Sequence, residues 1–153
     1  MIAIKPHHFV DIVTSLGRGV RSFAPDARGH ALHVVARAVQ ADPSLMLVVE
    51  LGADAICLPC RHNVRGLCDD VIDTSRRPAA PSSKREWNLR LDRRWCARLG
   101  LGQGERLTVR QLCVRLRDAA GDLVGIYPEE EAARTADRQA NLSQGIALLL
   151  GGL

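Results

Sequence analysis

The sequence predicts an α+β protein that is mostly helical, with a small β-sheet and a cysteine-rich metal-binding loop. Apolar residues recur at helical spacing in several segments, one short apolar run has the length of a strand, and a cysteine-bearing stretch lies between them. The chain has 153 residues, of which 46% are hydrophobic and 25% charged, a composition typical of one globular domain. We divide it into a metal-binding domain over residues 1–120 and a C-terminal helical extension over residues 121–153 that packs on it.

The first half of the chain is expected to hold two helices and one strand. Pro6 suits the first turn of a helix that ends near Gly17. Asp26 has the side chain of an N-cap for a second helix, which should end before Pro43. Residues 45–51 are apolar and partly β-branched, so we expect a buried strand there.

The second half is expected to be helical apart from a linker and one short strand. Residues 75–83 hold two prolines and three serines, which predicts a linker. A helix should follow over residues 84–99, and a capping-box pattern at Thr108 opens the next one. Residues 123–127 indicate a short strand. Pro128 and the three glutamates after it are typical of a helix start.

Composition and the N-terminal sequence narrow the class of protein. The formal net charge is +4, and aromatic residues make up only 3%, which argues against a platform that stacks single-stranded nucleic acid. No signal-peptide pattern is present and no apolar run is long enough to span a membrane, so a cytoplasmic location is expected. In that compartment disulfides are disfavoured, and clustered cysteines indicate metal ligands or redox groups.

The cysteine-bearing loop over residues 54–68 carries the strongest chemical signal. Cys57 and Cys60 place two thiols across a tight turn, and Cys68 follows after turn residues that allow the chain to curl back. Three soft thiolates at this spacing suit an iron–sulfur cluster or zinc. Thioredoxin-type chemistry expects the pair at the start of a helix, which the following residues do not indicate. We therefore predict that the three cysteines bind one metal centre, with an iron–sulfur cluster favoured and zinc as the alternative.

A fourth ligand is needed, and the sequence leaves its identity open. The candidates are His7, His8, Asp11, His62, Cys96 and Cys113. His7 and His8 are adjacent at a helix start, and their ring nitrogens can ligate a metal or transfer a proton near neutral pH. Cys96 and Cys113 lie in expected amphipathic helices, where a cysteine is more often a small buried hydrophobe.

Together these residues resemble the DUF1284 family, small bacterial and archaeal proteins of unknown function that are suspected of binding iron–sulfur clusters. The motifs that carry the resemblance are Lys5-Pro6-His7-His8, residues 54–60, Gly66-Leu67-Cys68, Leu91-Asp92, Leu99-Gly100-Leu101 and residues 104–112. The resemblance covers about residues 4–116, and it implies that both histidines and the three cysteines belong to one site beside the N-terminal helix. Family members commonly carry a cysteine where this chain has Asp11, so the resemblance implies that Asp11, a histidine or Cys96 takes its place.

Three functions fit these residues. The first is an iron–sulfur protein in electron transfer or redox sensing, with a redox partner protein. The second is a zinc-stabilised module that binds protein or, less favoured, nucleic acid through Arg85, Arg90, Arg93, Arg94 and Arg98. The third is a small metalloenzyme that uses His7 or His8 beside a cysteine-bound metal. No catalytic residue is assigned. The apolar C-terminal residues need burial, either on the core or against a second copy of the chain, so a homodimer is a further expectation.

Overall fold

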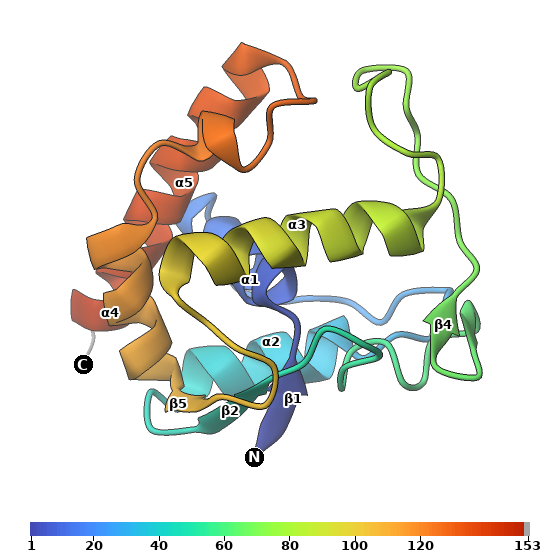
Figure 1. Ribbon diagram of the computed structural model, residues 1–153. Coiled ribbons are helices and arrows are strands. Elements are labelled where there is room, and N and C mark those ends of the chain that lie inside the picture. Colours follow the sequence, from blue (N-terminus) through green and yellow to red (C-terminus); the bar gives the residue numbers. More distant parts are fainter. Residues whose placement is uncertain (152–153) are drawn as a thin grey trace.

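The computed structural model describes residues 1–151 and confirms the α+β prediction (Figure 1). Helices and strands alternate irregularly along the chain, and residues 152 and 153 of the predicted extension lie outside the described part. The helices are α1 (Pro6–Gly17), α2 (Leu32–Ala41), α3 (Lys84–Leu99), α4 (Val109–Ala119) and α5 (Ala132–Gly151), with a 3-10 turn η1 (Leu123–Gly125). The strands are β1 (Ile2–Ile4), β2 (Met46–Val49), β3 (Asn63–Val64), β4 (Leu67–Cys68) and β5 (Arg106–Thr108).

The main sheet has the order β1-β2-β5 and positions the site. The predicted strand β2 is central, parallel to β1 with Ile4 opposite Val49, and antiparallel to β5. Because β1 and β2 are parallel, the chain leaves both strands at the same end of the sheet. The N-terminus of α1 and the cysteine-bearing loop therefore meet there, and a hydrogen bond of 3.0 Å from Ala55 N to Ala3 O joins the loop to β1.

The core is built around α1, which α3 crosses and α5 packs along (Figure 1). Ile12 and Val13 of α1 are completely buried. Gly17 and Gly145 let the backbones of α1 and α5 approach: a Cβ on Gly145 would lie 1.9 Å from Val13 O, and one on Gly17 would lie 1.8 Å from Asn141 O. Only glycine fits at these two positions, so the C-terminal helix is closely packed against the first one.

Two helices match their sequence signals closely. The helix predicted over residues 84–99 is α3, and Ser83 Oγ caps it by accepting a hydrogen bond of 3.2 Å from Glu86 N. The capping box at the start of α4 is confirmed, since Thr108 Oγ1 accepts from Gln111 N at 3.1 Å and the Gln111 side chain returns a bond to Thr108 N.

Two predicted starts were wrong. Asp26 does not begin a helix; its Oδ1 accepts a hydrogen bond of 2.8 Å from Arg28 N in a local turn, and α2 begins only at Leu32. Pro128 lies in a turn and α5 begins at Ala132, because Glu129 and Glu130 are used in ion pairs with arginines instead of facing the helix end.

The strand predicted over residues 123–127 is also wrong, because this segment forms η1 and the turn after it. Leu123, Ile126 and Tyr127 are all buried, and their spacing of three and four residues is that of a helical turn. A strand would point alternate residues to opposite faces and could not bury all three together.

Candidate metal centre

The turn that carries Cys57 and Cys60 is organised by Asp54. Its Oδ1 accepts hydrogen bonds from Ile56 N at 3.1 Å and Cys57 N at 3.0 Å. Its backbone carbonyl accepts from Leu58 N at 3.0 Å, and Cys60 N donates to Cys57 O at 2.9 Å. These bonds close the Cys-x-x-Cys segment into a tight turn, so the two thiols start from neighbouring points of the backbone.

Cys68 is brought back to this turn by the hairpin of β3 and β4. The hairpin pairs Asn63 with Cys68 and Val64 with Leu67, so only Arg65 and Gly66 make the turn. Both have positive φ angles, of 54° and 85°, as a two-residue type I′ turn requires. The return predicted for this part of the loop is confirmed, and it places Cys68 opposite a residue only three positions after Cys60.

The three cysteines line one cavity of about 30 Å³. The other residues that line it are Lys5, Ala53, Asn63 and Gly66. Asn63 Oδ1 is buried and has no hydrogen-bond partner, although a buried amide oxygen is normally satisfied. All five cysteines of the chain are free thiols, and three soft sulfur donors with an unpaired oxygen beside them form a donor set that suits a metal.

The spacing of the sulfurs bears on which metal centre fits. A single tetrahedral ion with metal–sulfur bonds near 2.3 Å holds its sulfur ligands about 3.8 Å apart. Within residues 1–151 the sulfurs of Cys57, Cys60 and Cys68 do not all lie within 4.8 Å of one another. A cluster spreads its cysteine ligands over several metal atoms. A second cavity of about 120 Å³ shares Lys5, Gly66 and Cys68 with the first and supplies adjoining space.

The environment of Cys57 opposes a free thiolate. Burial, together with the negative charge of Asp54, raises the pKa of the Cys57 thiol to about 11. A thiol of this kind is a poor nucleophile at neutral pH, which agrees with ranking thioredoxin-type chemistry below metal binding. It becomes a ligand when a metal displaces its proton.

Asp54 also connects the cysteine turn to His8. The carboxylate is completely buried, and its Oδ2 lies 2.8 Å from Lys5 N and 2.7 Å from His8 Nδ1. Burial alone would raise the pKa of Asp54, but the bonds from His8 and from backbone N–H groups outweigh it and hold the pKa well below its usual value. An ionised carboxylate only accepts, so His8 Nδ1 is the donor and Nε2 is left free.

His7 is held in the same way by a different carboxylate. Its backbone N and its Nδ1 each lie 2.8 Å from Asp92 Oδ1, which comes from α3 and is completely buried. Burial would lower the pKa of His7, but the charge and hydrogen bond of Asp92 raise it overall. Burial and the positive charge of His7 together lower the pKa of His8. The pKa values of the two adjacent rings, whose centroids are 4.2 Å apart, are therefore shifted in opposite directions.

His8, Asp54 and Cys57 form the group of three whose ligand atoms all lie within 4.8 Å of one another. Both Asp54 oxygens are already engaged in hydrogen bonds, so this carboxylate orients His8 rather than offering a free ligand. Of the two histidines and Asp11, His8 is therefore the one that the structure places beside a cysteine.

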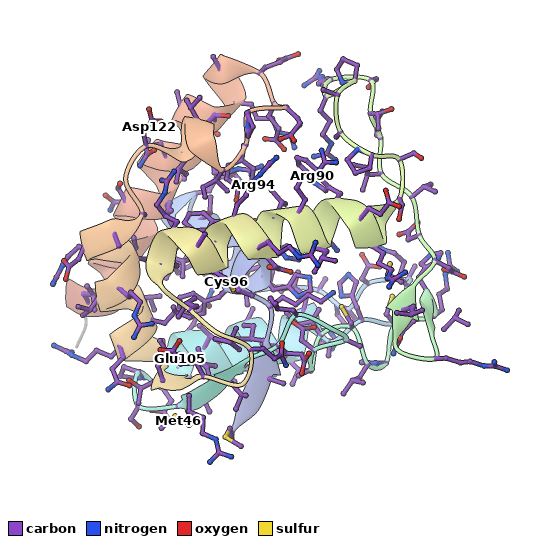
Figure 2. The ribbon with its side chains drawn as sticks, viewed as in Figure 1. Met46, Arg90, Arg94, Cys96, Glu105 and Asp122 are labelled. Atoms are coloured by element: carbon purple, nitrogen blue, oxygen red, sulfur yellow. The ribbon has the colours of Figure 1, made fainter. Side chains whose placement is uncertain are left out.

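The remaining candidates for a fourth ligand lie elsewhere. Asp11 and the two histidines line a separate, larger cavity. His62 Nδ1 lies 2.8 Å from Asp69 Oδ1 near the surface. Cys96 packs against the core from α3, on the face away from Arg94 (Figure 2). Cys113 is completely buried in α4, where burial raises the pKa of its thiol to about 12. These thiols have the environment of small hydrophobes.

Sequence reasoning missed the roles of Asp54, Asp92 and Lys5. The sequence did contain a signal that the two acids are buried, because apolar residues surround each of them. Asp54 lies between two alanines, and Asp92 lies on the same face of α3 as Leu91 and Trp95. A carboxylate at a core position usually has a dedicated partner.

Comparison with known proteins leaves the family open. No protein-family model matches the chain, and no curated protein or solved structure matches it significantly. The resemblance to the DUF1284 family therefore stays a prediction. Among residues 1–151, no helix combines the length and the apolar character that crossing a membrane requires.

Proposed function

We propose that this protein binds an iron–sulfur cluster through Cys57, Cys60 and Cys68 and uses it in electron transfer or redox sensing. The observation that carries the proposal is the shared cavity of the three cysteines, which all come from residues 57–68. When bound, such a cluster takes up and releases electrons at a potential set by its ligands and surroundings.

The residues around the cavity suit a negatively charged centre. Lys5 lines both cavities and is 7% exposed, and its positive charge lowers the pKa of the Cys57 thiol against the larger, opposite effect of burial. A positive charge in such a position favours the deprotonated, metal-binding form of the cysteines. The buried amide oxygen of Asn63 and the oriented ring of His8 are side chains able to complete or adjust the ligand set.

The surface next to the centre offers a place for a redox partner protein. Leu58, Val64 and Leu67 are 64%, 49% and 49% exposed, respectively. They belong to the same turn and hairpin as the three cysteines. Contact through these side chains would place a partner within a few residues of the cluster, which short-range electron transfer needs.

Metal analysis and an absorption spectrum of anaerobically purified protein test the proposal. We expect iron and acid-labile sulfide, with visible absorption that bleaches on reduction. Cys57→Ser, Cys60→Ser and Cys68→Ser should each lose the cluster, while Cys96→Ser, the same change outside the cavity, should keep it. Protein with neither iron nor zinc, and with the three thiols freely alkylated in the folded state, would contradict the proposal.

A zinc-stabilised interaction module is the second candidate, favoured by the small volume of the cysteine cavity. About 30 Å³ is room for one water-sized group, and so for a single ion. A colourless protein with one zinc per chain would select this candidate.

Three of the five arginines of α3 are engaged within the chain, which leaves Arg85 and Arg93 exposed. Arg94 lies 2.8 Å and Arg90 3.1 Å from the carboxylate of Glu129, on the face of α3 that points toward the segment before α5 (Figure 2). Arg98 donates to the carbonyls of Ala120 and Asp122. Because these three guanidinium groups are engaged within the chain, a zinc-stabilised module would bind protein rather than nucleic acid.

A further inference from the structure

A cavity of about 370 Å³ lies beside α1 and α3, near the start of α5, and the metal centre does not use it. His7 and His8 line it from α1, and Ile56, Trp87 and Leu91 give it an apolar wall. Five basic side chains also line it, namely Arg28, Lys84, Arg77, Arg134 and Arg138. Its volume is that of a site for a small organic molecule.

Three of these cations gather around a single carboxylate. Glu130 Oε1 lies 3.0 Å from Arg77 NH1, and Glu130 Oε2 lies 3.2 Å from Arg138 NH2 and 3.7 Å from Arg134 Nε. The Glu130 side chain is only 2% exposed. We call Arg77, Arg134 and Arg138 around Glu130 the arginine cluster. Because guanidinium groups stay charged in proteins, the cluster has three positive charges and one negative charge, an excess of two positive charges.

The other charges of the cavity leave this excess largely in place. Arg28 Nε lies 2.9 Å from Asp26 Oδ1, and Lys84 Nζ lies 3.4 Å from Asp70 Oδ2, so these two cations are each matched by a carboxylate. Asp11 also lines the cavity and offsets one charge of the arginine cluster. A net positive charge remains even before the histidines are counted.

Two of the three arginines of the cluster pack against aromatic rings. The guanidinium carbon of Arg138 lies 3.8 Å from the centroid of the Tyr127 ring, and that of Arg77 lies 5.4 Å from the centroid of Trp87. Cation–π contacts of this kind fix the planes of the two side chains. Figure 1 shows that the loop carrying Arg77 and the turn carrying Glu130 rise on the same side of α3, so the cluster joins the loop before α3 to the turn before α5.

The cluster is also incompletely satisfied. Glu130 Oε2 is buried and accepts no hydrogen bond, although Arg134 and Arg138 lie within 3.7 Å of it. The N–H groups of these two arginines are therefore not directed at this oxygen. N–H groups that do not bond Glu130 remain available to a ligand, and an oxyanion accepts such bonds.

We infer that this cavity binds a small molecule through an oxyanion group, a phosphate or a carboxylate, held by Arg77, Arg134 and Arg138. Planar guanidinium groups bind both kinds of oxyanion with paired hydrogen bonds. The apolar wall of Ile56, Trp87 and Leu91 would contact the rest of the molecule. The free Nε2 of His8 would lie at the inner end, next to the cysteine turn.

Binding at this cavity does not require the metal, so the two proposals can fail separately. The probes are inorganic phosphate and succinate, each titrated into the full-length protein at constant ionic strength and followed by calorimetry. We expect saturable binding of at least one probe, and the tighter of the two identifies the oxyanion.

Variants locate the site. Arg77→Gln and Arg134→Gln should each weaken binding by about tenfold or more, because each removes charged hydrogen bonds to the anion. Arg134 is the more exposed, with 49% of its side chain accessible, so its replacement should leave the fold intact. Arg93→Gln removes the same charge from an exposed position of α3 and should bind the probe as the wild type does. No saturable binding of either probe, or equal binding by all three variants, would overturn the inference.

Discussion

The cysteine turn and the arginine cluster are the two chemically unusual regions of this molecule, and they are built in opposite ways. Cys57, Cys60 and Cys68 come together through one tight turn and one hairpin, within a stretch whose geometry is local. The arginine cluster gathers residues from the linker and from the start of α5, and α1 and α3 complete its cavity. Spacing in the sequence can therefore predict the cysteine turn but cannot predict the arginine cluster.

His7 and His8 lie between the two regions and line the larger cavity together. His8 is tied to the cysteine turn through Asp54, whereas His7 is tied to α3 through Asp92. Two adjacent residues thus fasten α1 to two segments that are far apart in the chain. Replacing Asp54 should therefore affect the cysteine turn most strongly, and replacing Glu130 should affect the arginine cluster most strongly.

The largest effect is expected from Asp54→Ala. The change removes a completely buried carboxylate that accepts hydrogen bonds from Lys5, His8, Ile56 and Cys57. Losing one partner of a buried charged network typically costs about 3–5 kcal/mol of unfolding free energy. Denaturant unfolding measures it, with Asp73→Ala, at an exposed aspartate, as the control. Equal stability of the two variants would show that Asp54 does not organise the turn.

A smaller effect is expected from Glu130→Gln. The amide keeps the shape of the side chain but leaves three guanidinium groups without their shared negative charge, which should cost about 2 kcal/mol. Inorganic phosphate should restore part of this loss in thermal unfolding, because it replaces the missing anion. Wild-type stability of the variant, or a loss that phosphate does not reduce, would argue against an anion-binding cluster.

Gly66→Ala should cost about 1 kcal/mol, because an alanine is strained at the φ angle of 85° in the β3–β4 turn. No atom lies within 4 Å of the added Cβ, so the cost is one of backbone conformation alone. Gly102→Ala is the matched control, since the space around Gly102 is equally open and its φ angle is ordinary. The amount of bound metal should fall in Gly66→Ala and stay constant in Gly102→Ala. A loss of metal in Gly102→Ala alone would show that the conformation of the hairpin does not matter for metal binding.

Glu129→Gln tests an ion pair outside both regions, through the pH dependence of stability. Hydrogen bonds from Arg94, with a further one from Arg90, outweigh burial and lower the pKa of Glu129 from 4.5 to about 2. Because the folded-state pKa is lowered, the stabilisation is complete above pH 4.5 and is lost as the pH falls toward 2. Unfolding free energies across this window should fall less steeply in Glu129→Gln than in Glu131→Gln, at an exposed glutamate. Parallel pH profiles would show that the pair contributes nothing.

Local signals predicted much of the fold. The bounds of α3, the capping box at Thr108 and the return of the chain at Gly66 depend on a few neighbouring residues, and all three are confirmed. The strands β1 and β5 have only three residues each and form through pairing with β2, so periodicity could not indicate them.

The candidate site was only partly predictable for a related reason. The meeting of His8 with Asp54 depends on the parallel pairing of β1 and β2, which no local pattern reports. Glu130 resembles a helix-start acid in the sequence, and only the folded chain shows that it pairs with Arg77. Spacing can propose ligands that are close in the chain, but it cannot identify the buried acids that orient them.

X-ray absorption spectroscopy at the metal edge of the purified protein tests the central claim most directly. If Cys57, Cys60 and Cys68 hold the centre, sulfur should dominate the first shell, at about 2.3 Å from the metal. The sulfur signal should disappear in Cys57→Ser and persist in Cys96→Ser. A first shell made only of nitrogen and oxygen, or a sulfur shell unchanged by Cys57→Ser, would contradict the assignment of this centre to the cysteine turn.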